Sequence, residues 1–436
     1  MVGSMTGLRD MEKIRSLVKT GFFHIFGSSV LNKAVAFLSS VVLVRILTKA
    51  EYGVFTYAWN IYSIVVLANG CGLENGVLQM CSEKSGDEAY AQRISSYGVK
   101  YGLAFDLALA AVLLGIGMLA PLEIAGAGAL LCMLCALPMV KHVYNMAVMY
   151  LRAQGRNREY SGLSLMTTAA VFSVSAVCAF FFREKGMVLG YYGAYAASAA
   201  VGFWGMHIRM WDPRVQLEPS EKRALWSISL VSMCNNGLSQ LLYLLDVLVL
   251  GIMDPQETLL ASYRVATIIP TALAFIPSSL VVYIYPYFAQ HRGDGAWCMR
   301  QYRKAVLGLG GVNAVISAGL IALAPWVIGL MFGREYLDAV PVFRVLAANY
   351  FVSGTFRTLA GCLLVTQRRL KFNLMVGLIS GGVNILADFV LIGRWGSMGA
   401  ALATVLVTAV SAVMSTVYLV HVFRKARNTD ERGAAQ

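Results

Sequence analysis

Charged residues are scarce in this chain of 436 residues. Asp, Glu, Lys and Arg together make up 14% of it, whereas soluble proteins contain about 25%. Hydrophobic residues account for 58%, and the mean hydropathy is +0.64. This composition excludes a soluble globular enzyme, a disordered chain and a fibrous chain. The alternating pattern of a β-barrel porin is missing too, so an all-α polytopic membrane protein remains.

The sequence also lacks the motifs of several enzyme classes. It contains no Walker A glycine loop, no H-E-x-x-H and no G-x-S-x-G, so we do not expect ATP hydrolysis or another enzymatic activity. His24, His142 and His207 are scattered and form no metal constellation. Cys132 and Cys135 form a C-x-x-C inside an apolar stretch, without the neighbours of a metal or redox motif. We therefore expect no metal and no bound cofactor.

What the chain has instead is long apolar runs. A membrane-spanning helix needs about 20 mostly apolar residues, and twelve stretches meet this requirement. No small-residue cleavage site follows the first run, so we expect no signal peptide. The twelve stretches are residues 22–47, 53–80, 97–119, 122–148, 160–182, 187–208, 226–251, 259–288, 305–331, 342–366, 372–393 and 398–423.

The basic residues divide unequally between the two sets of loops. Of the 36 Lys and Arg, 24 lie in one set, which includes both termini, and 5 lie in the alternate set. Loops rich in Lys and Arg stay in the cytoplasm, so we expect both termini there. Most of the net charge of +13 thus sets orientation and contacts lipid. No basic patch with interleaved aromatic residues favours nucleic acid as a partner.

The two halves of the sequence resemble each other. Gln154 follows the fourth stretch, and Gln367 follows the tenth, 213 positions later. Gly190-x-x-Gly193 opens the sixth stretch and Gly396-x-x-Gly399 opens the twelfth, at an offset of 206. Six spans are an even number, so both halves enter the membrane in the same direction and form a parallel repeat.

This repeat predicts a domain organisation. We expect two six-helix bundles, at residues 1–208 and 226–423, which enclose a central cavity and alternate its access. A cytoplasmic linker at 209–225, with two prolines, would join them, and 424–436 would be a cytoplasmic tail.

Several charged residues lie inside the apolar stretches. A charge at the bilayer centre costs about 2.5–3.5 kcal/mol on insertion scales, so each should face a hydrated cavity, pair with a neighbour or reach an interface. Embedded cations outnumber embedded acids, which favours an anionic substrate. The candidate substrate-binding cations are Lys33, Arg45, Lys141, Arg264 and Arg357, and the candidate counter-ions or coupling-ion ligands are Glu74, Asp246 and Asp388.

Three prolines, Pro270, Pro277 and Pro286, lie in the eighth stretch. Proline removes a backbone donor and kinks a helix. Two interpretations remain open: a hinge that gates a transport path, or static kinks that packing absorbs.

Four segments resemble one family. Residues 45–55 match R-x-L-x-x-x-E-Y-G-x-F, residues 332–339 resemble F-G-x-x-Y-x-x-A, and Asn384 precedes a G-x-x-G-A-A pattern. Asp246 begins a similar D-V-x-V-L-G segment. Together they resemble the polysaccharide-transport branch of the multidrug/oligosaccharidyl-lipid/polysaccharide (MOP) exporter superfamily, whose members are O-antigen (Wzx-type) flippases.

The resemblance implies a MATE-like, V-shaped pair of bundles in a bacterial or archaeal cytoplasmic membrane. The substrate would be an undecaprenyl-pyrophosphate-linked oligosaccharide, an O-antigen or capsular or exopolysaccharide unit, flipped to the outer leaflet and coupled to H⁺ or Na⁺. Membrane lipids, a polysaccharide polymerase and glycosyltransferases would be its partners. Lys33, Arg264 and Arg357 lie on spans that can supply the substrate-facing surface.

Two other functions compete with this one. A cation-coupled multidrug exporter of the same fold would favour acidic or aromatic cavity residues, and here the embedded cations prevail. A membrane glycosyltransferase or polymerase would need a carboxylate cluster in a sizeable outer loop, and the expected outer loops are too short for one.

Overall fold

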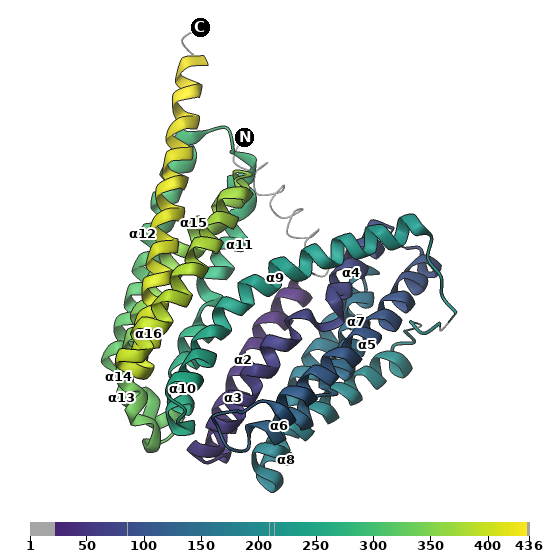
Figure 1. The fold of residues 1–436 in the computed structure, drawn as a ribbon. Coiled ribbons are helices and arrows are strands. Elements are labelled where there is room, and N and C mark those ends of the chain that lie inside the picture. The colour runs from purple at the N-terminus through teal and green to yellow at the C-terminus, as the bar shows by residue number, and fades with distance from the viewer. Residues whose placement is uncertain (1–21, 85, 209, 213, 434–436) are drawn as a thin grey trace. The chain divides into compact units, whose positions relative to one another are not determined.

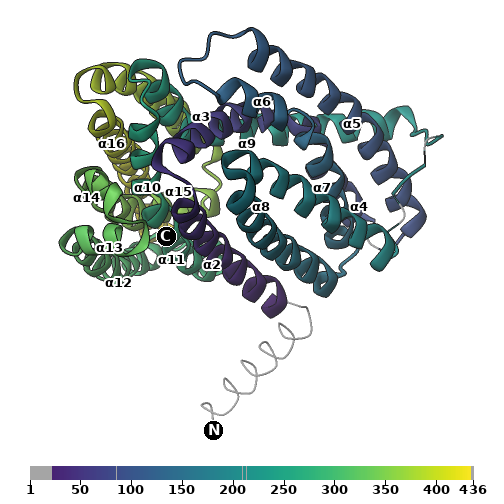
Figure 2. The ribbon, with the colours of Figure 1, turned by 90° about the horizontal axis from the view of Figure 1, so that it is seen from below.

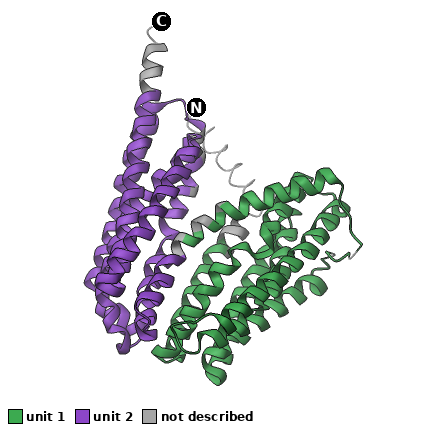
Figure 3. Ribbon diagram, in the orientation of Figure 1, with its two compact units in different colours: residues 1–241 green, residues 242–436 purple. Residues whose placement is uncertain are grey.

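The computed structural model describes residues 22–84, 86–208, 210–212 and 214–433, and all regular structure in these residues is helical (Figure 1). The chain divides into two compact units, residues 1–241 and 242–436 (Figure 3). The boundary between them lies inside helix α9 (Pro219–Met253). The bundle, linker and tail limits expected above stay predictions, and the basic residues before residue 22 lie outside the described residues.

In the described part of unit 1, α3 follows α2 and starts with a capping box. The Thr48 hydroxyl accepts the Glu51 backbone N–H at 3.3 Å, and the Glu51 carboxylate accepts the Thr48 N–H at 2.8 Å, so α3 has a fixed start. Helix α8 packs on both α2 and α7 within this unit (Figure 2). Its elements are α2 (Phe22–Ile46), α3 (Lys49–Val65), η1 (Val66–Gly72), α4 (Leu73–Glu83), α5 (Glu88–Leu119), α6 (Ala127–Leu134), α7 (Leu137–Ala153), α8 (Asn157–Ala200) and η2 (Val201–Gly205).

Unit 2 contains the broken helix that the prolines predict. Helix α10 ends at Leu273 and α11 begins at Phe275, and Pro277 has no N–H to donate to the Leu273 carbonyl. The elements that follow α9 are α10 (Glu257–Leu273), α11 (Phe275–Gln290), α12 (Gly295–Ala322), α13 (Ala324–Met331), η3 (Arg334–Ala339), α14 (Val340–Val352), the π-helix η4 (Ser353–Arg357), α15 (Thr358–Thr366) and α16 (Leu370–Gly433).

Two long helical runs, α8 and α16, are each a pair of antiparallel helices. The backbone reverses at Arg183 (φ 56°) in α8 and at Gly396 (φ 52°) in α16. Just past each reversal, a glycine packs against the backbone of the preceding arm. A Cβ on Gly186 would overlap the Cys178 carbonyl, and a Cβ on Gly399 would overlap the Leu391 carbonyl. Each arm is long enough to cross a bilayer.

The number of spans agrees with this description. Among the described residues, 8 helices are long and apolar enough to cross a membrane, or 9 with the bent pair of α6 and α7. When the arms of both reversing helices are counted separately and α9 is included, the helices are consistent with the twelve expected spans.

Matching turns in the two units confirm the internal repeat. After α7, the N–H of Arg156 bonds to the Leu151 carbonyl, and after α15 the N–H of Arg369 bonds to the Leu364 carbonyl. These pairs differ by 213 positions, as Gln154 and Gln367 do. Helices α5 and α12 follow an offset of 207: Asp87 caps α5 and Asp294 caps α12, each accepting the backbone N–H three residues later.

One alignment drawn from the sequence is wrong. The G-x-x-G patterns paired Gly190 with Gly396 at an offset of 206, but the reversal at Gly396 corresponds to Arg183, 213 positions earlier. Gly190 instead lies against Ser175 inside the first reversing helix. The pattern misled because Gly190 allows a close approach of two helices whereas Gly396 supplies the positive φ of a reversal, and only the backbone distinguishes these two uses of glycine.

Candidate functional site

The five cations expected to bind substrate are spread over both units. Lys33 and Arg45 lie exposed on α2, and Arg357 lies exposed at the end of η4. Arg264, on α10, and Lys141, on α7, are half-buried. Within unit 1, Lys141 interacts electrostatically with Glu74, so these two belong to one polar cluster. A substrate-binding role for the five cations stays a prediction.

The two acids expected to bind a coupling ion meet in unit 2. Asp246, on α9, accepts hydrogen bonds from the Tyr263 hydroxyl at 3.0 Å, the Thr404 hydroxyl at 2.6 Å and the Asn384 amide at 3.2 Å. Asp388, one turn beyond Asn384 on α16, interacts electrostatically with Asp246. Asp246 is 9% exposed and Asp388 is 0% exposed, so both carboxyl groups are removed from water.

Asp388 differs from Asp246 in its surroundings. Among the described residues, its carboxyl oxygens have no hydrogen-bond partner other than the Asp246 carboxyl group, which can share a proton with it, and Oδ1 of Asn384 has none. Buried polar atoms are nearly always paired, and a buried carboxylate needs a proton or a cation nearby. Carboxylate, amide and hydroxyl oxygens are the ligands that hard cations prefer. This cluster can therefore take up a proton or a small hard cation.

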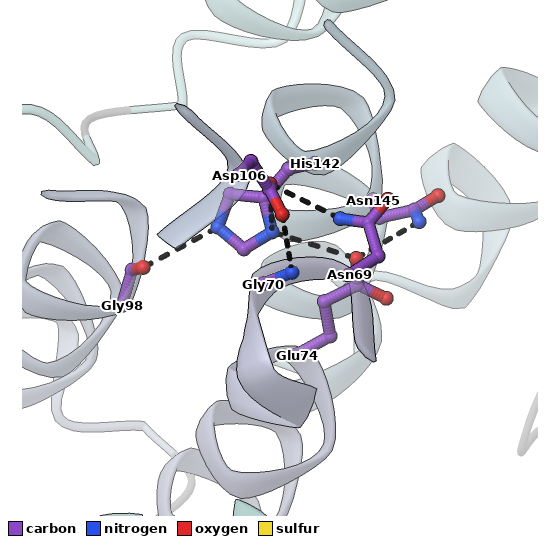
Figure 4. Close-up of polar contacts among 7 residues, drawn as sticks. All are labelled: Asn69, Gly70, Glu74, Gly98, Asp106, His142 and Asn145. Atoms are coloured by element: carbon purple, nitrogen blue, oxygen red, sulfur yellow. Dashed lines mark hydrogen bonds and ion pairs between the residues drawn. The ribbon is translucent and has the colours of Figure 1, made fainter. Parts of the chain in front are cut away.

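A second polar cluster lies in unit 1, where η1 interrupts the helix between α3 and α4 (Figure 4). The Asp106 carboxylate, on α5, accepts the Gly70 backbone N–H at 2.7 Å and the Asn69 side-chain amide at 3.1 Å. Gly70 and Cys71 have φ values of 54° and 51°, which a helix cannot contain. Asp106 thus binds the backbone where it leaves the helical path.

The imidazole of His142 lies in the centre of this cluster. Its Nδ1 is 3.6 Å from a Glu74 carboxylate oxygen and 3.8 Å from an Asp106 carboxylate oxygen. Its Nε2 is 3.3 Å from the Gly98 carbonyl oxygen, and Asn145 donates to Glu74 at 2.9 Å. Both His142 and Asp106 are fully buried.

Two glycines make the space for this ring. A Cβ on Gly70 or on Gly102 would overlap the imidazole of His142, so the ring is held between η1 and α5. The described residues contain no group of three or more His, Cys, Asp or Glu placed to hold a metal ion. The cluster consists of one imidazole, two carboxyl groups and two side-chain amides.

Comparison with known proteins places the chain in a family. The model of the polysaccharide biosynthesis protein family matches residues 42–341. The chain belongs to this family. A curated relative, the EPS I polysaccharide export inner membrane protein EpsE of Ralstonia solanacearum, is 24% identical over 345 residues, which cover 75% of this chain and 76% of that protein.

Solved structures show the same fold. An inward-facing multidrug resistance MATE transporter of the MOP superfamily matches with a TM-score of 0.72 and 13% identity, over 91% of this chain and 96% of that one. The lipid II flippase MurJ, in an inward closed conformation, matches with a TM-score of 0.70 and 12% identity, over 92% and 89%. These findings confirm the expected fold and the resemblance to the polysaccharide-transport branch of the MOP superfamily. The three relatives are named as an export protein, a transporter and a flippase, and none as an enzyme.

In this polysaccharide biosynthesis protein, the glutamate of the 45–55 motif has a structural role. The Arg183 guanidinium donates to the two Glu51 carboxylate oxygens at 2.9 and 2.7 Å and to the Ile46 carbonyl at 3.0 Å. The motif therefore ties the turn between α2 and α3 to the reversal of α8.

Sequence reasoning missed His142 and Asp106 as members of a site. His142 is classed above as a scattered histidine because its partners lie 36 to 68 positions earlier in the chain. The signal that was available is Gly70-x-Gly72 inside an apolar run: two glycines there indicate a break in the helix, and a break needs buried polar partners for its freed backbone groups.

Proposed function

We propose that this protein is a flippase that moves undecaprenyl-pyrophosphate-linked oligosaccharides from the cytoplasmic to the outer leaflet of the cytoplasmic membrane. Membership of a polysaccharide biosynthesis family is the observation that carries the proposal. The cations on its membrane helices support an anionic substrate, because guanidinium and ammonium groups complement phosphate. The sugars and the pyrophosphate would cross along a hydrated cationic path by alternating access, while the isoprenoid tail stays in lipid.

The coupling ion would bind in unit 2, at Asp246 and Asp388. The carboxyl oxygens of Asp388, which among the described residues have no partner beyond the Asp246 carboxyl group, and Oδ1 of Asn384 support this assignment, and either H⁺ or Na⁺ satisfies them. Both termini would face the cytoplasm, as the loop charges indicate. The enzymes that supply the lipid-linked unit and polymerise it, glycosyltransferases and a polysaccharide polymerase, would work on the two sides of the membrane.

A flipping assay tests the proposal. Purified protein is reconstituted into proteoliposomes with a fluorescent lipid-pyrophosphate oligosaccharide, and accessibility of the glycan to a membrane-impermeant quencher is followed under Na⁺ or H⁺ gradients. We expect gradient-dependent translocation. No protein-dependent translocation of any lipid-pyrophosphate glycan, with export of organic cations in its place, would show a multidrug exporter of the same fold.

Variants test the cationic path in the same assay. Lys33→Ala and Arg357→Ala should lower the flipping rate without lowering the amount of protein in the membrane. Arg303→Ala is the matched control, because Arg303 is an exposed cation near the start of α12, in the basic set of loops. Wild-type rates in both test variants would remove these residues from the path.

A further inference from the structure

His142 Nε2 lies 3.3 Å from an acceptor, whereas Nδ1 is buried without a hydrogen-bond partner among the described residues and has two carboxyl groups nearby. The Gly98 carbonyl oxygen can only accept, so Nε2 must carry a hydrogen. The Nδ1 atom faces carboxylate oxygens of Glu74 and Asp106 at 3.6 and 3.8 Å. A neutral imidazole has one N–H and an imidazolium has two, so a proton on Nδ1 would place a positive charge beside both carboxyl groups.

Both carboxyl groups accept hydrogen bonds from N–H donors. Asp106 accepts one backbone and one side-chain N–H, and Glu74 accepts the Asn145 amide. We infer that unit 1 contains a proton-binding site formed by His142, Glu74 and Asp106, whose bound proton stabilises the interruption of the helix at η1. The ligand is a proton, and the site is separate from the carboxyl pair of unit 2.

The neighbouring titratable groups do not replace this proton. Lys141 interacts with Glu74 and offsets one of the two carboxylate charges. Tyr62 of α3 and Cys71 of η1 interact with Asp106, and neither carries positive charge. When the proton leaves Nδ1 for water, one buried carboxylate charge is therefore uncompensated.

The internal repeat supplies a comparison within the same molecule. At the offset of 207 Asp106 corresponds to Asn313, and at the offset of 213 His142 corresponds to Thr355. The contact is preserved: the Asn313 amide donates to the Thr355 hydroxyl at 3.2 Å, and both residues are buried.

In unit 2, the uncharged side chains of Asn313 and Thr355 connect α12 to η4. This contact lies in the unit that contains the interruption between α10 and α11. The contact between α12 and η4 can therefore hold the fold without ionisable groups. Burying charged partners is less favourable than burying neutral ones of similar size, so three ionisable groups at the unit 1 position point to a role for the proton itself.

The proton also has a mechanical consequence. Asp106 holds the Gly70 N–H, and Cys71, a residue with a side chain, has a left-handed φ of 51° that surrounding contacts must maintain. Loss of the imidazolium charge would weaken the attraction that positions Asp106. The hydrogen bond that Asp106 accepts from the Gly70 N–H in η1 would weaken with it. Protonation of one buried site is thereby linked to the shape of one membrane helix.

Nitrogen NMR of histidine-labelled protein in nanodiscs tests this site directly, because the chain has only 5 histidines. The His142 signals are assigned by their loss in His142→Gln. At about pH 7.5, where an exposed imidazole is mostly neutral, we expect both His142 nitrogens to be protonated. A neutral His142 ring with a free lone pair on Nδ1 would overturn the proposal.

Variants separate proton binding from packing. Glu74→Gln should make His142 neutral at about pH 7.5, because the ring loses a carboxylate that favours its charge. The double variant Asp106→Asn/His142→Thr imitates unit 2 and should fold without the proton. Glu221→Gln, in a surface ion pair with Arg93, is the control and should leave the His142 signals unchanged.

Hydrogen exchange of residues 69–72 supplies a second readout. After correction for intrinsic rates, we expect about a tenfold larger opening equilibrium at high pH than at low pH in the wild type. The double variant should show no pH dependence there. The same pH dependence in both proteins would refute the link between the proton and η1. Neither measurement uses transport, so the result stands whatever substrate the protein carries.

Discussion

Replacing Asp388 by Asn should stabilise the protein in the absence of the proposed coupling ion. Among the described residues, the carboxyl oxygens of Asp388 are fully buried and have no hydrogen-bond partner other than the Asp246 carboxyl group, and an unsatisfied buried polar group costs about 1–3 kcal/mol, more when charged. Asparagine has the same size, carries no charge and places an amide N–H beside the Asp246 carboxylate. We therefore expect a gain of about 1–3 kcal/mol in the free energy of unfolding of unit 2.

The same substitution should remove the response to the ion. A cation at 100 times its dissociation constant stabilises the folded state by about 2.7 kcal/mol. At about 2–4 °C per kcal/mol for a domain of this size, both effects are measurable as a thermal midpoint in detergent. Wild type should melt several degrees higher in NaCl, or at lower pH, than in choline chloride at neutral pH. Asp388→Asn should melt high in all of these conditions.

Equal concentrations of choline chloride hold the ionic strength constant, so screening of surface charge does not differ between samples. Glu335→Gln is the matched control, because it removes an exposed carboxylate from the same unit and should keep the wild-type response. If Asp388→Asn melts below wild type without the ion and still responds to Na⁺ or to pH, then Asp388 is satisfied by another group and the assignment is wrong.

Three further predictions concern the helices around the sites. Gly186→Ala should destabilise the protein by about 1–3 kcal/mol, because the new Cβ meets backbone that cannot move away. Gly193→Ala is the control: its Cβ would make only ordinary contacts, so this variant should be neutral or stabilising. Thermal unfolding compares the two variants. Arg183→Ala should lower stability by at most about 1 kcal/mol, because its pair with Glu51 is partly exposed, and a larger loss would mean that the pair holds the reversal of α8. Pro277→Ala restores a donor for the Leu273 carbonyl and should slow flipping at unchanged membrane abundance, which an unchanged rate would contradict.

Much of the fold follows from patterns that are local in the sequence. Apolar runs of sufficient length predict membrane helices because each backbone group in lipid must be bonded within its own helix. The prolines predicted the interruption near Leu273 for the same reason: a missing donor is a local property. The reversal at Arg183 was placed between two stretches correctly, yet its equivalence to Gly396 was not, because an arginine at positive φ leaves no glycine for a pattern to detect.

The polar sites were predictable only in part. Asp246 and Asp388 stood out because a charge in an apolar run is unfavourable by itself, so each attracts notice without knowledge of its partner. His142 did not, because a neutral histidine is tolerated in a helix and its meaning depends on Asp106 and Glu74, which two other helices bring to it. Such a constellation is a property of packing and cannot be read from spacing along the chain.

Comparison of the two units distinguishes buried polar groups that serve the shared fold from those that occur in one unit alone. Both units have a buried polar contact beside an interrupted helix, but only unit 1 makes it with ionisable groups. Conversely, Asp388 of unit 2 corresponds, at the offset of 213, to Ser175 of unit 1, a buried and uncharged residue. If ionisable groups served the shared scaffold, they would occur at equivalent positions in both units. Their placement at different positions supports a separate proposed titratable site in each unit, where a proton and the proposed coupling ion would act on different helices.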